Sequence, residues 1–304
     1  MALDSRAYRG GGFALKIGDS EPGYCRKVDL GKVSNEIITH NLGGMLRQKK
    51  HGGKMKHDPL TVEVGIGMGR KLYEWIKNSF DNKHTRMDGE VLITDQDNKV
   101  MRTCEFTNAM ITEISTTKFD AKSGKTPGYF TIKFQPETVR YTNGGGSIGT
   151  VKAGDKQKQW IDNNFNFDAA GLPTKHLISV DAVKWTQKVQ EHAVGEFIES
   201  QYEGTAVECG DLKLTLASTD YAQWYDWAKS WFFEGKKTES DERAMAINIL
   251  AQDAKEVIGT INFENCGLKE FTFAALEANA DKLNTFDVTL YTEAYKFDIK
   301  AYNG

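Results

Sequence analysis

The chain contains one pattern twice, and this duplication constrains its fold more than any other feature of the sequence. The clearest segment is residues 71–80, KLYEWIKNSF, which returns as residues 223–232, QWYDWAKSWF, 152 positions later. The same offset holds without a gap from Phe13, which aligns with Phe165, through Phe80. Beyond this segment the offset becomes 157, as between Asn108 and Asn265, and then 156. A frame kept over this length indicates a tandem duplication of one fold.

Both copies of the segment predict a helix with an aromatic face, at about 71–81 and about 221–233. The apolar residues recur at the spacing of one helix face, with Trp75 and Trp227 at equivalent positions. A stripe of this kind is typical of a helix that packs on a hydrophobic core. We therefore expect Trp75 and Trp227 to anchor each helix to its own domain.

The rest of each copy predicts short strands, because apolar and polar residues alternate between turn residues. In the first copy the predicted strands are residues 13–18, 24–30, 31–39, 61–66, 90–94, 99–108, 111–118 and 129–140, with a long hairpin arm or loop at 40–57. Many strands and one helix per copy indicate a mainly β protein, with a β-barrel or sandwich and one flanking helix in each repeat. We expect a first domain at 1–142, a glycine-rich linker at 143–164 and a second domain at 165–304, each with its own core.

Composition excludes several classes of protein. No apolar run approaches the roughly 20 residues that cross a bilayer, so we expect no membrane insertion by this chain. The first residues show no apolar signal core, which argues against Sec-type export. The four cysteines form no CxxC pair and do not align between the repeats, so they are expected to be reduced thiols.

The motifs that resemble catalytic or cofactor sites are better explained by structure. Residues 65–71, GIGMGRK, lie where a phosphate loop would, but match neither GxGxxG nor the Walker spacing. Gly144-x-Gly146-x-x-Gly149 is typical of a linker, and Asp95 and Asp97 of a hairpin turn. The six histidines show no metal-ligand spacing. The sequence therefore predicts no catalytic, cofactor or metal site, and no enzyme activity.

The two copies differ in the sign of their net charge. Residues 1–150 carry 23 Lys and Arg against 17 Asp and Glu, a balance of +6, and the rest carries 16 against 25, a balance of −9. The difference is concentrated in the arm, whose first copy (40–57) has five basic and no acidic residues: Arg47, Lys49, Lys50, Lys54 and Lys56. The equivalent window, 192–209, has no Lys or Arg and four acidic residues: Glu196, Glu199, Glu203 and Glu208. Two solvated loops that drifted apart would give this pattern, and so would nucleic-acid binding, although 40–57 lacks an aromatic residue for stacking. The interpretation we favour is that the two arms pack near one another during assembly.

Several of these features together resemble the tail tube proteins of contractile phage tails and related contractile injection systems. They are the opening strand pair (13–30), the glycine-containing basic arm (40–57) before a strand and the Leu72–Ile76 motif LYEWI, Asp88-Gly89-Glu90, the segment 104–109 (CEFTNA) and a closing strand at 129–141. The second repeat carries the pattern more weakly, in its Trp-rich helix and in residues 261–265, INFEN. The resemblance covers nearly all of the first repeat.

The resemblance implies β-barrels of about six strands with a flanking helix, joined by sheet edges into rings around a channel. It implies a structural protein at the level of the inner tube, the tube initiator or the baseplate hub, with DNA or an effector as channel cargo. The implied partners are further copies of the chain, as a trimer with six domains or a hexamer in stacked rings, and sheath or baseplate proteins. The implied location is a virion tail or an extracellular injection particle, assembled in the bacterial cytoplasm. The alternative from the residues alone is a ligand-binding module or enzyme on a duplicated β-barrel.

Overall fold

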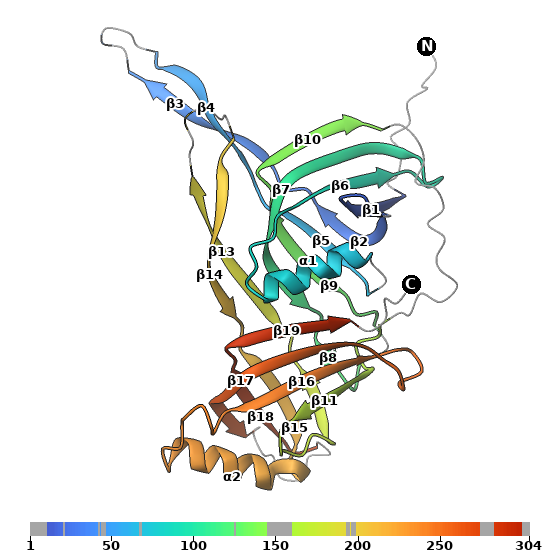
Figure 1. Ribbon diagram of the computed structural model, residues 1–304, viewed down its shortest axis with the longest axis vertical. Helices are drawn as coiled ribbons and strands as arrows, with labels where there is room; N and C mark the ends of the chain where they lie inside the picture. Colours follow the sequence, from blue (N-terminus) through green and yellow to red (C-terminus); the bar gives the residue numbers. More distant parts are fainter. Residues whose placement is uncertain are drawn as a thin grey trace.

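The protein is mainly β, as predicted, with two tandem barrel-like domains (Figure 1). The computed structural model describes residues 11–20, 22–41, 43, 47–66, 69–124, 126–144, 160–192, 195, 199–273 and 283–299. The elements of the first domain are β1 (Gly12–Ile17), β2 (Gly23–Asp29), β3 (Val33–His40), β4 (Lys49–His57), β5 (Leu60–Val64), α1 (Arg70–Phe80), β6 (Met87–Thr94), β7 (Val100–Thr116), β8 (Phe119–Asp120), β9 (Phe130–Gln135) and β10 (Thr138–Asn143). Those of the second are β11 (Phe165–Ala169), β12 (Leu177–Val180), β13 (Lys184–His192), β14 (Gln201–Cys209), β15 (Leu212–Ala217), a 3-10 turn (Ser218–Asp220), α2 (Tyr221–Phe232), β16 (Arg243–Leu250), β17 (Val257–Phe273), β18 (Thr285–Tyr291) and β19 (Ala294–Ile299).

Six antiparallel strands close the first barrel. Their order is β7-β6-β1-β2-β5-β9, and β9 pairs with β7 to complete the circle. In the second domain the equivalent strands run β11-β16-β17-β18-β15-β12. Among the described residues, the outer strands β11 and β12 do not pair with each other, and β12 pairs instead with β8 of the first domain. The second barrel is therefore open at the place where β1 and β2 close the first.

The duplication extends to irregular details of the backbone. Asn108 and Asn265 both adopt a left-handed conformation, with φ of 50° and 53°, at register shifts of β7 and β17. Each side-chain amide donates a hydrogen bond to the equivalent carboxylate, of Glu137 at 2.9 Å and of Glu293 at 2.7 Å. Asparagine tolerates this conformation better than other residues with a side chain because its amide bonds locally. The offset found in the sequence is thus also the structural offset.

The two helices are attached in the same way. Trp75 is fully buried, and its indole nitrogen donates to the carbonyl of Thr85 at 2.9 Å. Trp227 is 6% exposed and donates to the carbonyl of Asp241 at 3.2 Å. A buried indole needs such a partner for its N–H. Each tryptophan therefore joins the apolar face of its helix to the segment that follows it.

The structure corrects three expectations. The segments predicted as separate strands at 99–108 and 111–118 form the single strand β7, which is bent by bulges rather than interrupted. The two repeats share one continuous hydrophobic core instead of having separate cores. Trp160, in the range expected as linker, is buried against Phe119 and Phe130. Residues 145–159 of that range lie outside the described residues.

Candidate assembly surfaces

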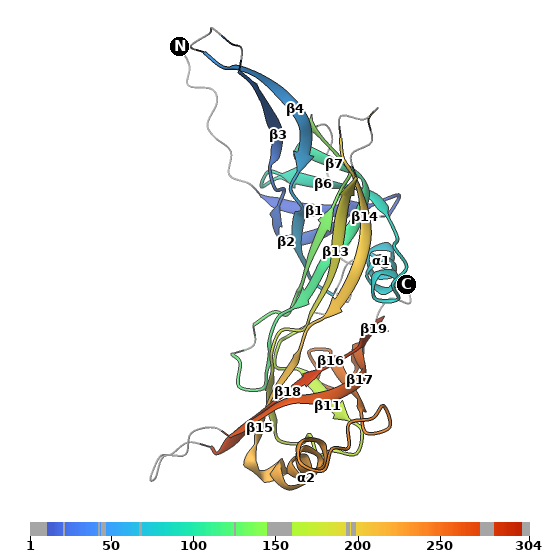
Figure 2. The same ribbon diagram turned by 90° about the vertical axis from the view of Figure 1, so that its left-hand side faces the viewer.

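The arm of the second repeat is a two-stranded hairpin, β13–β14, that lies along the first domain (Figures 1 and 2). Lys184, Trp185 and Thr186 pair antiparallel with Ser115, Ile114 and Glu113 of β7. The hairpin thereby extends the sheet of the first barrel, and β7 has a partner on both sides at this point. Strand addition of this kind joins two domains through main-chain hydrogen bonds.

Trp185 anchors this hairpin to the first domain. Its side chain is 1% exposed and meets the ring of Phe80, from α1, edge to face at 5.6 Å. Close by, the Lys184 ammonium lies 3.1 Å from the Glu113 carboxylate. Phe80 also meets Phe297 of β19 at 6.1 Å, so α1 lies against two elements of the second domain. The interface therefore combines sheet pairing, an aromatic cluster and an ion pair.

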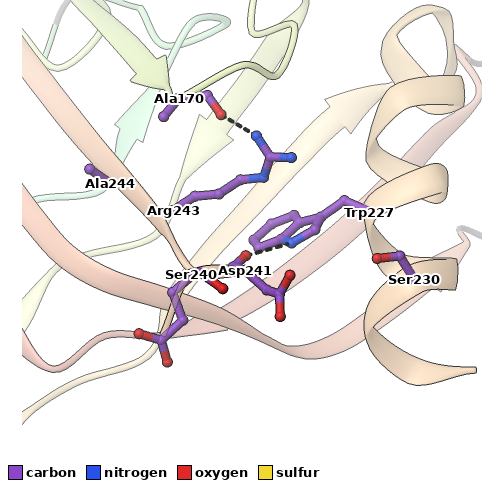
Figure 3. A pocket seen from close by; sticks show the side chains of 8 residues that line it. Ala170, Trp227, Ser230, Ser240, Asp241, Arg243 and Ala244 are labelled. Atoms are coloured by element: carbon purple, nitrogen blue, oxygen red, sulfur yellow. Dashed lines mark hydrogen bonds between the residues drawn. The ribbon is translucent and has the colours of Figure 1, made fainter. Parts of the chain in front are cut away.

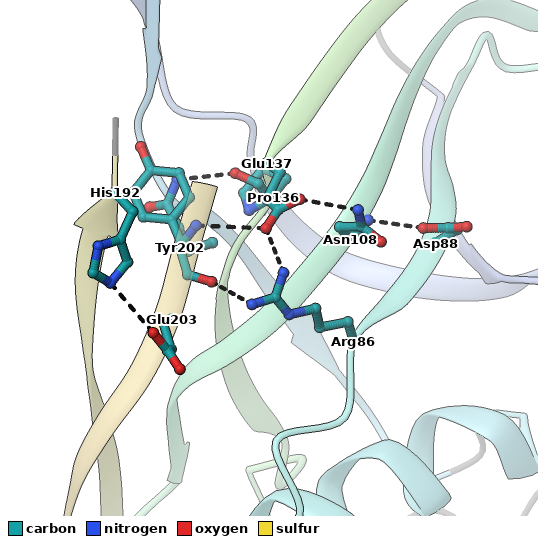
Figure 4. Close-up of polar contacts among 9 residues, drawn as sticks. Arg86, Asp88, Asn108, Pro136, Glu137, His192, Tyr202 and Glu203 are labelled. Carbon is teal, nitrogen blue, oxygen red and sulfur yellow. Dashed lines mark hydrogen bonds and ion pairs between the residues drawn. The ribbon is translucent and has the colours of Figure 1, made fainter. Parts of the chain in front are cut away.

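A polar network continues this interface toward the tip of the hairpin (Figure 4). Arg86 bridges the domains, since it pairs with Glu137 of the first and donates to the carbonyl of Tyr202 in the second at 2.6 Å. Glu137 is held in turn by the amide of Asn108. His192 and Glu203, at the outer end of the hairpin, pair with each other at 3.3 Å. The network fixes the hairpin on the barrel beyond the last sheet hydrogen bond.

The base of the hairpin β3–β4 meets the outer end of the hairpin β13–β14 within one chain, through a contact that the sequence did not indicate. Lys56 lies 3.0 Å from Glu191, which was not among the predicted acidic residues. A hydrogen bond from Ser200 and another from Lys56 lower the pKa of the Glu191 carboxyl. Of the other basic arm residues, Arg47, Lys49 and Lys50 are exposed and Lys54 is half-buried. None of these four forms an ion pair with the rest of the described chain.

Glu199 is the predicted acidic residue that contacts the first arm. Its carboxylate pairs with Arg140, accepts a hydrogen bond from Thr138 at 2.6 Å and lies 3.8 Å from His57. Burial opposes ionisation of Glu199, but these partners outweigh it and the pKa is lowered. For His57, burial disfavours the protonated form and lowers the pKa. Glu203 pairs with His192 of its own hairpin and Glu208 is exposed, whereas Glu196 lies outside the described residues.

The arm of the first repeat has the same hairpin form but a different environment. β3 and β4 form a sheet of two strands, which an isolated bridge between Met55 and Glu199 joins to the second repeat. The hairpin projects from the end of the molecule opposite to α2 (Figures 1 and 2). Three apolar side chains on β3 are exposed, those of Val33, Ile37 and Ile38. Exposed apolar residues gathered on one element mark an interaction surface. The hairpin β3–β4 is therefore a candidate for contact with another molecule.

The cavity in Figure 3 does not resemble a catalytic site. It has a volume of about 310 Å³ and lies between α2 and the start of β16. Arg243 lines it, donating to the carbonyl of Ala170 and lying 5.2 Å over the Trp227 ring. Within the described residues, no three His, Cys, Asp or Glu gather as a metal site, and no helix is long and apolar enough to span a membrane. The residues that line the cavity thus form a structural cation–π contact.

The four cysteines are free thiols, and burial raises the pKa of each. The pKa is about 12 for Cys25 and Cys266 and about 11 for Cys104 and Cys209. Because the thiolate is the reactive form, these side chains are poor nucleophiles at neutral pH.

Sequence reasoning missed the residues that join the two domains, above all Trp185, Arg86 and Glu137. The sequence did contain a signal for Trp185. It aligns with Val33, the first residue of β3, and a large aromatic residue at a strand position predicted to be solvated indicates a contact. Arg86 and Glu137 gave no such signal, because single charged residues next to turns are common on any surface.

Comparison with known proteins places the chain in a family. The model of the T4-like virus tail tube protein gp19 family matches residues 11–146 and, a second time, residues 162–296. The protein belongs to this tail tube family, and it carries the family's domain twice. It is therefore a structural protein of the tail tube class.

Solved structures resemble one half of the chain. The sheath/tube terminator of PVC, an extracellular contractile injection system, is 22% identical with a TM-score of 0.39, and the match covers 46% of this chain and 99% of that one. The tube-terminating cap of the anti-feeding prophage is 18% identical with a TM-score of 0.39, and the match covers 47% of this chain and 99% of that one. Hcp1 from Flavobacterium johnsoniae is 20% identical with a TM-score of 0.30, and the match covers 45% of this chain and 98% of that one. A search of the curated proteins finds no relative by sequence.

Proposed function

We propose that three copies of the chain form a ring of six domains around a channel, without catalytic activity. The ring belongs to the tube, the tube initiator or the baseplate of a contractile phage tail or injection system, and DNA or an effector protein is its cargo. Rings stack on one another and contact sheath or baseplate proteins. Assembly takes place in the bacterial cytoplasm before the particle is released.

One observation carries this proposal: the chain has two domains of the tube family, already joined by strand addition from the second to the first. The charges support it, because a ring of three chains alternates domains of balance +6 and −9 and places opposite signs side by side. Exposed ion pairs contribute little to affinity, so charge sets order and register while sheet edges and apolar surfaces hold the ring.

Native mass spectrometry and negative-stain microscopy of the purified protein test the proposal. The expected result is rings that contain three chains, whose assembly slows at 1 M salt, where screening shortens to about 3 Å, while circular dichroism shows folded domains. Changing Lys49, Lys50 and Lys54 to Glu is expected to block assembly, and changing Glu203 and Glu208 to Lys to restore it in part. Rings of six chains would contradict the trimer, and stoichiometric zinc or nucleotide in the assembled protein would contradict the absence of a cofactor site.

A further inference from the structure

The far end of the second domain carries an aromatic groove. Its volume is about 390 Å³, and it is lined by Tyr225, Ala228, Phe232, Phe233, Lys269, Glu270, Phe271 and Phe273. Phe233 and Phe273 are 78% and 52% exposed, and Phe232 is 38% exposed. Leaving several large aromatic side chains in water is costly, so a surface of this kind is typical of an interface. The internal duplication shows what covers it.

The same surface of the first domain is already covered, by the chain's own second domain. Phe80 aligns with Phe232 and Tyr73 with Tyr225, and both are buried in the first domain. Three aromatic residues of the second domain meet them. Trp185 from β13 meets Phe80 at 5.6 Å, and Tyr295 from β19 meets Phe80 at 6.1 Å. Phe297, also from β19, meets Tyr73 at 6.2 Å and Phe80 at 6.1 Å. A partner of the groove in the second domain must supply the equivalents of Trp185 and Phe297.

Those equivalents are Val33 on β3 and Tyr141 on β10, and both are exposed. Val33 is 45% exposed where Trp185 is 1%, and Tyr141 is 46% exposed where Phe297 is 4%. They cannot reach the groove of their own chain, because β3 and β10 lie at the end of the molecule opposite to α2 (Figure 1). Two faces that match each other but lie at opposite ends of one molecule join successive copies head to tail.

The backbone and the charges fit the same contact. β17 pairs with β18 along Glu270–Phe273, and no other strand of the described chain pairs with its second edge there. The equivalent edge of β7 is the one that receives β13, and a bulge precedes Glu270 as it precedes Glu113. Lys32 aligns with Lys184 and Glu270 with Glu113, so the ion pair that joins the domains within one chain can also form between chains.

Side-chain volume is redistributed across this contact. In the contact between the two domains of one chain, the large Trp185 packs against Phe80. The smaller Asp81 follows Phe80, and the smaller Thr116 lies two residues after Ile114, the strand partner of Trp185. The groove has Phe233 and Phe273 at the positions of Asp81 and Thr116, and its proposed occupant has the smaller Val33. Large residues facing small ones keep the contact filled. The match does not extend to the tip of the hairpin. Within one chain Glu199 pairs with Arg140 there, whereas the equivalent positions hold two basic residues, Arg47 and Lys296.

We infer that the groove binds a second copy of the chain, with β3 of that copy adding to the edge of β17 and Tyr141 covering α2. Val33 then stands opposite Phe271, and Lys32 pairs with Glu270. This inference rests on the proposed assembly and specifies the seam between chains. The seam repeats the contact between the two domains of one chain, so each step around the ring is made by the same kind of joint.

Cysteine cross-linking between two separate variants tests the seam. Directly opposed residues of paired strands are close enough for a disulfide, so Val33→Cys and Phe271→Cys are expected to cross-link when mixed and oxidised. Each variant alone is expected to stay uncross-linked, since the native thiols are poorly reactive. A covalent dimer in the mixture alone supports the seam. Its absence while rings form, or a homodimer of either variant, overturns it.

Association measurements separate this inference from the proposed ring. Val33→Asp and Phe233→Asp are each expected to weaken association at least 10-fold, with Tyr24→Asp, on an exposed site elsewhere in the first domain, as the matched control. Lys32→Glu is expected to weaken it several-fold and Glu270→Lys in the same chain to restore it. Unchanged rings in the first two variants overturn the seam and leave the ring standing. Cross-linking in the mixture without closed three-chain rings overturns the trimer and leaves the seam standing.

Discussion

The hairpins β3–β4 and β13–β14 occupy equivalent positions in two copies of one fold, yet their surroundings are opposite. β13–β14 completes the sheet of a neighbouring domain and buries Trp185, whereas β3–β4 projects and exposes Val33. The difference lies in what each hairpin can reach, since the second has the first domain beside it in the same chain. The hairpin β13–β14 is thus a joint between domains, and duplication has placed this joint inside the molecule.

The largest effects are expected where the repeats are alike. Replacing Trp75 or Trp227 with Ala removes a buried indole that anchors a helix, and each should lower the free energy of unfolding by roughly 3–5 kcal/mol. Trp75 is expected at the upper end, because it is completely buried. Denaturant unfolding monitored by circular dichroism measures both. Phe233→Ala is the control for the isolated chain, where its exposed side chain should leave stability nearly unchanged. A smaller loss for Trp75→Ala than for this control contradicts the assignment.

A smaller effect is expected where the repeats differ. Trp185→Ala should cost roughly 2–4 kcal/mol, because the hairpin can detach locally before the whole protein unfolds. Val33→Ala, at the equivalent position, should change the stability of the isolated chain by less than about 0.5 kcal/mol. Hydrogen exchange at Glu113–Ser115 should speed up in the first variant only. Equal effects of the two substitutions would show that the hairpins have the same environment in solution.

The smallest effect concerns acid at the junction of the two hairpins. Burial lowers the pKa of His57 below its ordinary 6.5, so the stability of the junction is complete above that pH and falls as pH drops toward the lowered folded value. The pKa of Glu191 is also lowered, so its contribution is present above the ordinary 4.5 and is lost as pH falls through the folded value. The lowered pKa of Glu199 places its loss in the same acid range. Thermal unfolding from pH 7 down to about 3 should therefore show two successive losses.

Two variants separate the steps in that titration. His57→Gln should remove the upper step and Glu191→Gln should reduce the lower one, which Glu199 shares. Glu63→Gln, on a carboxylate away from the junction, should change neither step. A single step that persists in both junction variants would assign the acid sensitivity to other groups.

Sequence reasoning predicted the class of fold because the features that determine it are local. Apolar periodicity identifies the helix around Trp75, and turn residues such as Asp95 and Asp97 separate β6 from β7. The bulge at Asn108 was not predicted, since a single asparagine in a strand does not reveal its backbone conformation. The long strand β7 was therefore divided in two.

The contacts of the candidate surfaces were harder to predict, because they join residues far apart in the chain. The opposite charges of the arms indicated that these segments meet, but not that Lys56 would pair with Glu191 and leave Lys49 and Lys50 in solvent. Charge patterns report the sign of a partner and carry no information on register. Register here follows from the pairing of β13 with β7, which periodicity within one segment cannot show.

The pairing of β13 with β7 also affects how the chain folds during synthesis. β13 lies about 70 residues after the segment of β7 that it joins, so the first barrel leaves the ribosome with one edge of its sheet unpaired. At ~5–20 residues per second this state lasts for several seconds. An unpaired edge accepts strands from other molecules, and the β3 strand of a neighbouring nascent chain resembles β13 in position. We therefore expect slower translation between these two strands to favour pairing between neighbouring chains over pairing within one chain.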